Sequence, residues 1–451
     1  MPARRRRWPR RRATPLVWSV QGLSRLSSPS GYARTLQSKC LVGYPTGVVV
    51  IQTSDSTGAA SGAPESAAAD ARFAAEVRDW LAENLAGEFG KLRGLGGPGR
   101  EHEAFDERLA WDRHLAAAGW TCLGWPVEYG GRAASVRQQV IFHEEYAKAD
   151  APSRVSHVGE ELLGPTLLAF GTPAQRDRFL PGIKTVSELW CQGYSEPGAG
   201  SDLAAITTAA HLDGDEWSIS GQKIWTSLAH VADWCFVLAR TERGSSRHKG
   251  LSYLLVPMKQ PGVDVRPIVQ LTGTSEFNEV FFDNARTGAD LVVGAPGDGW
   301  RVAMGTLNVE RGISTLGQQI RFARELTDIE ALARRTGAAD DPLIADRIDR
   351  AWVGLRVLRA HALRTMTDAG ADAAGQASVA KLLWANWHRG LGELAMAVLG
   401  PSGLVAGERD LTEWQRLYLF TRADTIYGGS NEVQRNIIAE RVLGLPREAR
   451  S

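Results

Sequence analysis

Hydrophobic positions divide the chain into two helical stretches on either side of a stretch of strands. Between residues 66 and 188 apolar side chains recur at helical spacing, as at Phe73, Val77 and Leu81. From about residue 190 to 293, short β-branched and aromatic runs are separated by Gly, Asp and Pro. The expected strands are Trp217–Ile219, Trp234–Ala239, Leu251–Val256, Val263–Val269 and Glu279–Asp283.

The helical period returns from Gly299 onward, with one long apolar face through Ile313, Ile320 and Leu332. Further helices are expected at about 342–369, 374–398 and 431–443. Helices, then strands, then helices predict an α+β protein built from packed layers. We expect an N-terminal helical domain, a central small antiparallel β domain and a C-terminal domain resembling a four-helix bundle.

The expected boundaries are 66–189, 190–297 and 298–451, after a basic extension and linker at 1–65. The first twelve residues carry seven arginines, and no acidic residue precedes Asp55. Three interpretations remain open for this extension: an unstructured segment, an organellar transit peptide or a basic arm that touches nucleic acid. The Ser/Gly/Ala-rich stretch from Thr53 to Ala69 is interpreted as a linker.

Composition excludes several classes of protein. A net charge of +1 offers no global attraction for nucleic acid or an anionic membrane, and no apolar run is long enough to span a bilayer. The four cysteines lie far apart and form no CxxC pair, which argues against a zinc site or a disulfide framework. We therefore expect a cytoplasmic protein with reduced thiols.

Three motifs carry the candidate chemistry. They are a Gly-rich loop at Gln192–Asp202, a segment at Ser220–Ser227 and a third at Tyr427–Arg435, which reads YGGSNEVQR. In this order and spacing the motifs resemble those of the acyl-CoA dehydrogenase family of flavoenzymes. The resemblance extends from about residue 66 to 447. It implies that family's fold and an enzyme that binds FAD.

The resemblance assigns roles to the first motif. It implies that Ser195 lies near the reactive nitrogen of the flavin and that Gln192 and Tyr194 belong to the same site, Tyr194 through its backbone. Gly200 and Ser201 are expected near the pyrophosphate or the acyl-CoA. Glycines permit close approach and left-handed dihedrals, and hydroxyls donate or accept hydrogen bonds. Without the other motifs, this loop would be an ordinary Gly-rich surface turn.

The other two motifs complete the expected cofactor site. The Trp225 indole is suited to pack against the flavin, although a core aromatic is an equally common role, and the family pattern places Ser227 on the flavin. In the third motif Ser430 or Asn431 can cap the helix that follows. A helix N-terminus favours anionic oxygens and so suits a dinucleotide.

The catalytic base departs from the commonest family pattern. Much of the family places a glutamate directly after the tyrosine of the third motif, where this chain has Gly428. Other members carry the glutamate on the first long helix of the C-terminal domain, which implies Glu310 here. Glu310 stands three residues before Ile313, on the apolar face, where burial would raise its pKa. Gly428 keeps a backbone N–H that can donate to the thioester oxygen.

Three further positions bear on the substrate and the assembly. Arg311 is a candidate contact for substrate or CoA, although a structural salt bridge is nearly as plausible. Many relatives carry an Arg-x-x-Phe element that reaches the flavin of a neighbouring subunit. Here Arg334 is followed by Gly337 in place of Phe, and a Gly-Gly-x-Gly turn is only approximated at 399–403.

We therefore expect an FAD-dependent acyl-CoA dehydrogenase that acts on an acyl-CoA in lipid or steroid degradation and passes electrons to an electron-transfer flavoprotein. A homo- or heterotetramer, or a dimer, is expected, with no metal, nucleic acid or membrane partner. The alternatives are a flavin-poor partner subunit of a heteromeric enzyme, a non-catalytic DNA-binding flavoprotein of this fold, and an oxidase or monooxygenase on the same scaffold. The sequence does not specify the acyl group.

Overall fold

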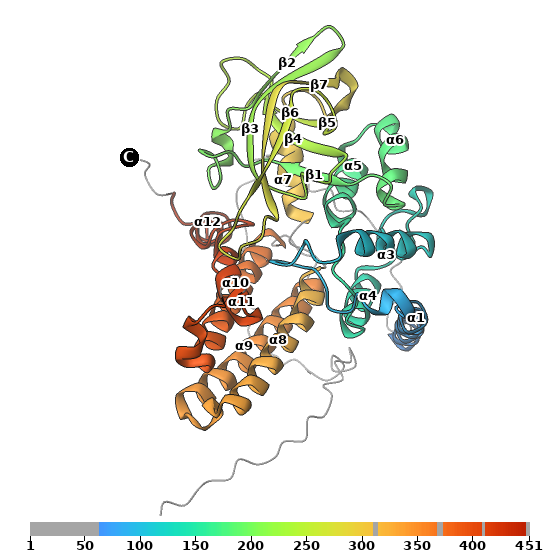
Figure 1. Cartoon of the computed structure of the whole chain (residues 1–451). Helices are drawn as coiled ribbons and strands as arrows, with labels where there is room; N and C mark the ends of the chain where they lie inside the picture. The colour runs from blue at the N-terminus through green and yellow to red at the C-terminus, as the bar shows by residue number, and fades with distance from the viewer. Residues whose placement is uncertain (1–62, 310–313, 368–372, 408–410, 448–451) are drawn as a thin grey trace, which may run out of the picture. The chain divides into compact units, whose positions relative to one another are not determined.

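The computed structural model describes residues 63–309, 314–367, 373–407 and 411–447. Within this part of the chain, helices precede and follow one eight-stranded sheet (Figure 1), which confirms the expected α+β class. The basic extension interpreted from the sequence lies outside the described residues. None of the described helices is both long and apolar enough to cross a membrane.

The N-terminal helices pack around an aromatic core. They are α1 (Ala63–Asn84), α2 (Gly87–Gly90), α3 (Phe105–Ala117), α4 (Val136–Lys148), the π-helix η3 (Val158–Leu163), α5 (Gly164–Phe170) and α6 (Pro173–Lys184). Val77, Leu81, Trp111 and Trp120 are buried together in this core. Helix α1 begins at Ala63, so residues 63–69, expected to be linker, are helical. Their alanine content favours that state.

The strands form a mixed sheet in the order β6-β7-β3-β2-β4-β5-β8, and β1 pairs with β4. The strands are β1 (Trp190–Gly193), β2 (Ala209–Asp213), β3 (Glu216–Ser227), β4 (Trp234–Arg240), β5 (Leu251–Pro257), β6 (Val263–Ile268), β7 (Phe277–Gly288) and β8 (Val292–Val293). Most pairs are antiparallel, as expected. However, β1 runs parallel to β4, and β2 also meets β4 in parallel.

The sheet shares its core with helices on either side of it in the sequence. Leu163 and Phe179 from the N-terminal helices, Phe236 and Tyr253 from the sheet, and Val302 from α7 (Gly299–Val309) form one buried cluster. Since strands β4 and β5 are buried along almost their whole length, both faces of the sheet are covered there. This shared core fixes the position of β1, and the first motif begins on that strand.

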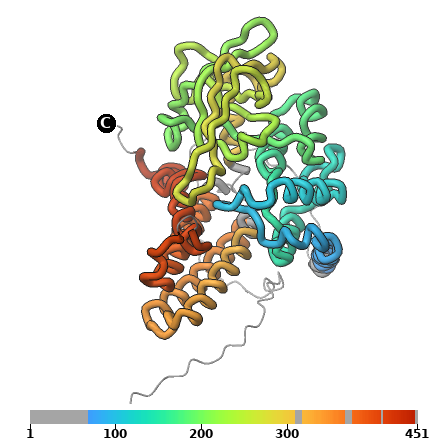
Figure 2. Tube along the Cα trace, in the orientation of Figure 1, coloured from blue at the N-terminus to red at the C-terminus, as the bar shows by residue number. Residues whose placement is uncertain are grey.

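The C-terminal helices are α8 (Ser314–Thr336), α9 (Pro342–Thr367), α10 (Ala373–Leu399), α11 (Glu413–Phe420) and α12 (Asn431–Ile437), and the π-helix η9 (Ile438–Val442) follows α12. Helices α8, α9 and α10 pack on one another (Figure 2). Their core includes Leu326, Ile329, Ile344, Leu391 and Leu394. The expected single helix at 431–443 is thus two segments, because hydrogen bonding changes from α to π after Ile437.

Candidate functional site

The loop after β1 is held to strand β3 by a buried ion pair. The Lys223 ammonium, fully buried, lies 2.9 Å from Glu196 Oε1 and also donates to the Tyr194 carbonyl at 3.0 Å. Glu196 in turn accepts the backbone N–H groups of Thr207 and Thr208 at 2.7 and 2.9 Å. A backbone hydrogen bond from Ile224 N to the Ser195 carbonyl joins the first two motifs directly.

The charge on Glu196 is strongly favoured in this setting. Burial alone would raise the pKa of this carboxyl, but the Lys223 ammonium and the hydrogen bonds from Thr208 and Thr207 lower it to about 2. A carboxylate with three or more donors is fixed in position. The loop after Glu196 is therefore fixed at its start, although most of its residues are exposed.

The glycines of the loop leave open space around the backbone. A Cβ atom built on Gly198 or Gly200 would meet no other atom within 4 Å. Neither glycine has a positive φ, so the left-handed dihedrals expected from the sequence are absent. Because these glycines have no side chain, a ligand can approach their backbone closely. Ser201 is exposed beside them, and Ser195 is half-buried.

The side chains of Gln192 and Tyr194 differ in their surroundings. Tyr194 is buried, and its ring packs edge-on against Phe236 and Tyr253, so its backbone is the part that remains for a ligand. Gln192 Nε2 is buried and has no hydrogen-bond partner among the described residues. An unpaired buried donor calls for a ligand or a water molecule. The loop therefore fits a ligand with polar acceptor atoms at its edge.

Trp225 stands on a bulge near the C-terminal end of β3. The pairing register of β3 with β7 shifts between Lys223 and Thr226, and Trp225 has a φ of +61°. The bulge leaves its indole 55% exposed, with an edge-on contact to Phe277. A large aromatic held exposed by strained backbone is typical of a binding site. Ser227 ends the strand opposite Phe277 and is half-buried.

The third motif turns through two left-handed glycines. Gly428 has a φ of +63° and Gly429 a φ of +90°. The Gln434 amide donates to the Gly428 carbonyl at 3.0 Å and closes the turn. The Ser430 hydroxyl accepts from Val433 N at 3.4 Å and caps α12. Asn431 is buried, and its amide exchanges hydrogen bonds with Asn386, which leaves its backbone for a ligand.

Beneath this turn lies a buried amine. Lys381 on α10 is 6% exposed, and its Nζ donates to the Asp424 carbonyl at 2.5 Å. The ammonium lies 4.0 Å from the ring centre of Trp384 and 4.5 Å from that of Tyr427. A Cβ built on Gly428 would lie 3.9 Å from Nζ. A positive charge therefore stands directly behind the position where much of the family has a carboxylate.

The third motif is connected to the sheet through the loop between β6 and β7. Arg416 on α11 lies 3.5 Å from the Thr272 carbonyl of this loop. Glu276, at the end of the loop, accepts the backbone N–H groups of Gly99 and Glu101, both at 2.9 Å. Since Phe277 follows and contacts Trp225, one segment joins the second motif to the helix that precedes the third. Neither the sequence motifs nor their spacing indicated this connection.

Of the remaining expected site residues, one lies away from the three motifs and two lie outside the described residues. Arg334 is exposed near the end of α8 and pairs with Glu330 one turn earlier. Glu310 and Arg311 lie outside the described residues, between Val309 at the end of α7 and Ser314 at the start of α8. Within the described ranges no group of three His, Cys, Asp or Glu side chains is arranged to hold a metal ion.

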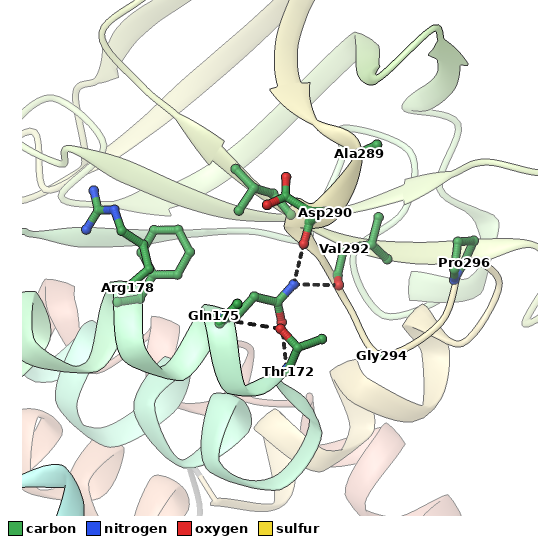
Figure 3. A pocket seen from close by; sticks show the side chains of 11 residues that line it. Thr172, Gln175, Arg178, Ala289, Asp290, Val292, Gly294 and Pro296 are labelled. Carbon is green, nitrogen blue, oxygen red and sulfur yellow. Dashed lines mark hydrogen bonds between the residues drawn. The ribbon is translucent and has the colours of Figure 1, made fainter.

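One cleft lies away from the motifs. It is formed between α6 and the segment around β8, and its lining includes Thr172, Gln175, Arg178, Asp290 and Val292 (Figure 3). Gln175 is committed to the carbonyls of Asp290 and Val292 at 2.6 and 2.8 Å, so its amide joins the helix to the sheet. None of the candidate site residues named from the sequence lines this cleft.

Sequence reasoning missed the residues that support the motifs. Glu196 and Lys223 lie within the motif segments but were given no role, and their pairing requires the fold. Lys381, His388 and Asp424 lie outside the motif segments. A lysine or histidine within the helix expected at 374–398 is a signal that could have directed attention to α10, although it does not identify a partner.

Family models and curated relatives assign the chain to the same protein family. The acyl-CoA dehydrogenase N-terminal, middle and C-terminal domain models match residues 68–186, 191–285 and 297–443. Acyl-CoA dehydrogenase IpdE1 of Mycobacterium tuberculosis is 71% identical over 378 residues, which cover 84% of this chain and 98% of that relative.

Two solved structures resemble the chain as well. One, described as the Tcur3481-Tcur3483 steroid ACAD, has 30% identity and a TM-score of 0.73 over 84% of this chain and 98% of its own. The ChsE4-ChsE5 complex from Mycobacterium tuberculosis has 29% identity and a TM-score of 0.71, with the same coverage of the two chains.

Proposed function

Because the chain belongs to the acyl-CoA dehydrogenase family, we propose that it catalyses FAD-dependent α,β-dehydrogenation of an acyl-CoA thioester, with Glu310 as the base. The observation that carries the proposal is the paired arrangement of the first two motifs. The buried Glu196–Lys223 ion pair presents open glycine backbone on one segment, and the bulge in β3 presents the exposed Trp225 on the next.

The residues of this site fit FAD. Gln192 has a buried donor without a protein partner, Gly198 and Gly200 leave room for close approach, and the Trp225 indole is available for packing against a planar ring. We propose that Ser195, Ser201, Ser227 and Ser430 supply hydroxyls to the cofactor, and that Tyr194 and Asn431 supply backbone groups. When bound, FAD accepts the hydride that leaves the substrate's β carbon.

The protein's own part in the reaction concerns the α proton. We propose that the Glu310 carboxylate removes it, while the Gly428 N–H donates to the thioester oxygen as negative charge develops there. Gly428 presents this group on a left-handed turn that the Gln434 amide closes. Lys381, behind the turn, adds a positive charge to the same side of the site. Arg311 is proposed to contact the substrate or CoA.

For the substrate we propose a bulky acyl group of lipid or steroid origin. Support comes from the 30% identity to a protein described as a steroid ACAD. We further propose that the electron acceptor is an electron-transfer flavoprotein, as implied by the family resemblance. We also propose a second candidate role, that of a subunit in a heteromeric enzyme. Two structural relatives are described as two-protein assemblies, and this chain has Gly337 where many relatives have Phe.

The test begins with the flavin. The chain is purified alone and together with the product of a neighbouring gene, its FAD content is measured, and its absorbance is followed anaerobically with straight-chain, branched and steroid-derived acyl-CoAs. If only one class of acyl-CoA bleaches the flavin absorbance, that class contains the substrate. Bleaching only when the neighbour is present supports the heteromeric role. A protein that takes up no FAD in either preparation contradicts the proposal.

Glu310→Gln tests the base. The amide keeps the volume but cannot accept a proton, so flavin reduction should slow by about 10²–10⁴-fold while FAD content stays unchanged. Glu413→Gln, an exposed glutamate in the first turn of α11, is the matched control and should reduce flavin at the wild-type rate. If Glu310→Gln is also reduced at that rate, Glu310 is not the base.

A further inference from the structure

A chain of four hydrogen-bonded side chains lies behind the third motif. The Tyr427 hydroxyl donates to Asp424 Oδ1 at 2.7 Å, and Asp424 Oδ2 lies 2.7 Å from His388 Nδ1. His388 Nε2 lies 2.9 Å from Glu325 Oε2. The four residues come from η8 (Ala423–Thr425), the turn after it, α10 and α8. Two long helices are therefore connected to the tyrosine that precedes Gly428.

Asp424 is the centre of this arrangement. It is 1% exposed, and both of its carboxylate oxygens and its carbonyl are engaged. The carbonyl accepts the Lys381 ammonium at 2.5 Å, and Lys381 lies against the rings of Trp384 and Tyr427. A buried carboxylate is costly unless it is paired, so Asp424 requires a positively charged partner. His388 is the partner that contacts its side chain.

We propose that His388 acts as a positioning residue for the reaction: as an imidazolium between Glu325 and Asp424, it fixes Asp424, and Asp424 fixes Tyr427 and Lys381, the two residues that lie next to Gly428. This proposal rests on the proposed function, because Gly428 is the expected donor to the thioester oxygen. His388 touches neither substrate nor cofactor in this scheme and acts only through Asp424.

The charges around His388 support the imidazolium. The groups that face it are Glu325 from α8, Asp424 from η8 and, through Asp424, Lys381 and Tyr427. Burial alone would lower the pKa of His388. The two carboxylates outweigh burial and raise the pKa from 6.5 to about 9. The charged form therefore prevails at neutral pH and is lost as the pH rises through about 9.

The consequence for catalysis is geometric. Gly428 has a left-handed backbone with no side chain of its own to anchor it, so its N–H is aimed by its neighbours. A displacement of about 1 Å at a reacting centre can cost about 10²-fold in rate. Loss of the imidazolium would leave the Asp424 carboxylate without its cationic partner and would loosen its hold on Tyr427 and, through the Asp424 backbone, on Lys381.

The experiment compares three variants with the wild-type protein, each with FAD bound. His388→Gln removes the charge but keeps hydrogen-bonding atoms, and Glu325→Gln keeps the imidazole but removes one carboxylate. His361→Gln is the matched control, because His361 is a half-buried histidine on α9 that hydrogen-bonds to the Gln376 carbonyl and, among the described residues, not to a carboxylate. Two quantities are measured between pH 6 and 10.5: flavin reduction by acyl-CoA, and the spectral shift that a non-reducible thioether analogue of acyl-CoA causes in bound FAD.

We expect kcat of the wild type to fall as the pH rises through about 9. In His388→Gln, kcat at pH 7 should be about 10–100-fold lower, with KM within roughly threefold, unchanged FAD content and no transition near pH 9. In Glu325→Gln the transition should move to lower pH by about one unit. The control should match the wild type. The spectral shift should show the same transitions.

The proposal is overturned if the transition stays at the same pH in His388→Gln and Glu325→Gln, or if His388→Gln loses FAD and activity in parallel. Should His388→Gln not fold, Glu325→Gln alone decides, because it leaves His388 in place. A wild-type protein that binds FAD but is not reduced by any acyl-CoA refutes the proposed function instead. In that case the analogue's spectral shift still decides the role of His388.

Discussion

Two glycine-containing turns of this molecule are each held by a buried ion pair, but the central charge is a carboxylate in one turn and an imidazolium in the other. The loop after β1 depends on a carboxylate, Glu196, held by the ammonium of Lys223 from the neighbouring strand. The turn at Gly428 depends on a histidine, His388, held between two carboxylates from other helices. The first turn is therefore anchored within one sheet, whereas the second is anchored across several helices.

This difference gives the two turns opposite responses to pH. Since the pKa of Glu196 is lowered to about 2, the stability that it contributes is present above its ordinary value of 4.5 and is lost as the pH falls toward 2. The pKa of His388 is raised to about 9, so its contribution is present below 6.5 and is lost as the pH rises through about 9. Acid should weaken one anchor and alkali the other.

The largest effect is expected from Glu196→Gln. It leaves the fully buried Lys223 without its counter-charge, which typically costs about 3–5 kcal/mol. Denaturant unfolding of the apoprotein measures this loss, and FAD content should fall with it. The control is Asp264→Asn, which breaks an exposed pair with Arg266 and should cost under about 1 kcal/mol. Equal losses in the two variants would show that Glu196 is not an anchor.

The pH dependence of these effects is the next prediction. The difference in Tm between the wild type and Glu196→Gln should be constant above pH 4.5 and should shrink as the pH falls toward 2. For His388→Gln the difference should be constant below pH 6.5 and should shrink as the pH passes 9. Calorimetry across this range measures both. Parallel curves for the two variants would contradict the comparison.

A smaller effect is expected at Trp225. Trp225→Gly removes the indole but relieves the left-handed backbone, so FAD should bind about 10-fold more weakly while the apoprotein becomes no less stable. Quenching of flavin fluorescence measures the Kd. Asn284→Gly, at a φ of +54° at an exposed position of β7, relieves similar strain without removing an aromatic and should leave the Kd unchanged. If both variants bind FAD like the wild type, the indole does not contact the cofactor.

A loss of stability smaller than that of Glu196→Gln is expected at Gly428. Gly428→Ala places a side chain at a φ of +63°, which should cost about 1 kcal/mol, and the added Cβ has only ordinary contact with Lys381. Gly400→Ala, at a φ of +57° in open space, should cost the same. Flavin reduction should slow only in Gly428→Ala. Equal activity in both variants would remove Gly428 from the site.

The features of the fold that could be predicted from the sequence are those that depend on residues close together in the chain. Strand β4 at Trp234–Arg240 and β6 at Val263–Ile268 lie within one residue of their expected limits, because β-branched and aromatic runs between turn residues are local signals. The family resemblance, confirmed by the domain models that match the chain, rested on short contiguous motifs. The roles assigned to individual residues in those motifs stay predictions.

Features that depend on distant residues were not predictable. The bulge at Trp225 arises from a shift of register against β7, and no local pattern in β3 shows where a partner strand slips. The link from His388 to Asp424 and Glu325 needs the alignment of α8 with α10. Helix η3 adopts π geometry at Val158–Leu163, although its apolar spacing is compatible with an ordinary helix.

The lysine behind Gly428 also bears on how the catalytic base can migrate during evolution. A glutamate introduced at Gly428 would pay only the modest cost of its left-handed backbone, and it would meet Lys381 at the distance of an ordinary contact. If Glu310 is the base, as proposed above, that ammonium would offset the charge of a second carboxylate. A lineage could therefore carry glutamates at both Gly428 and Glu310 for a time and lose either one later. The exchange of the base between the two positions then needs two single substitutions rather than a simultaneous pair.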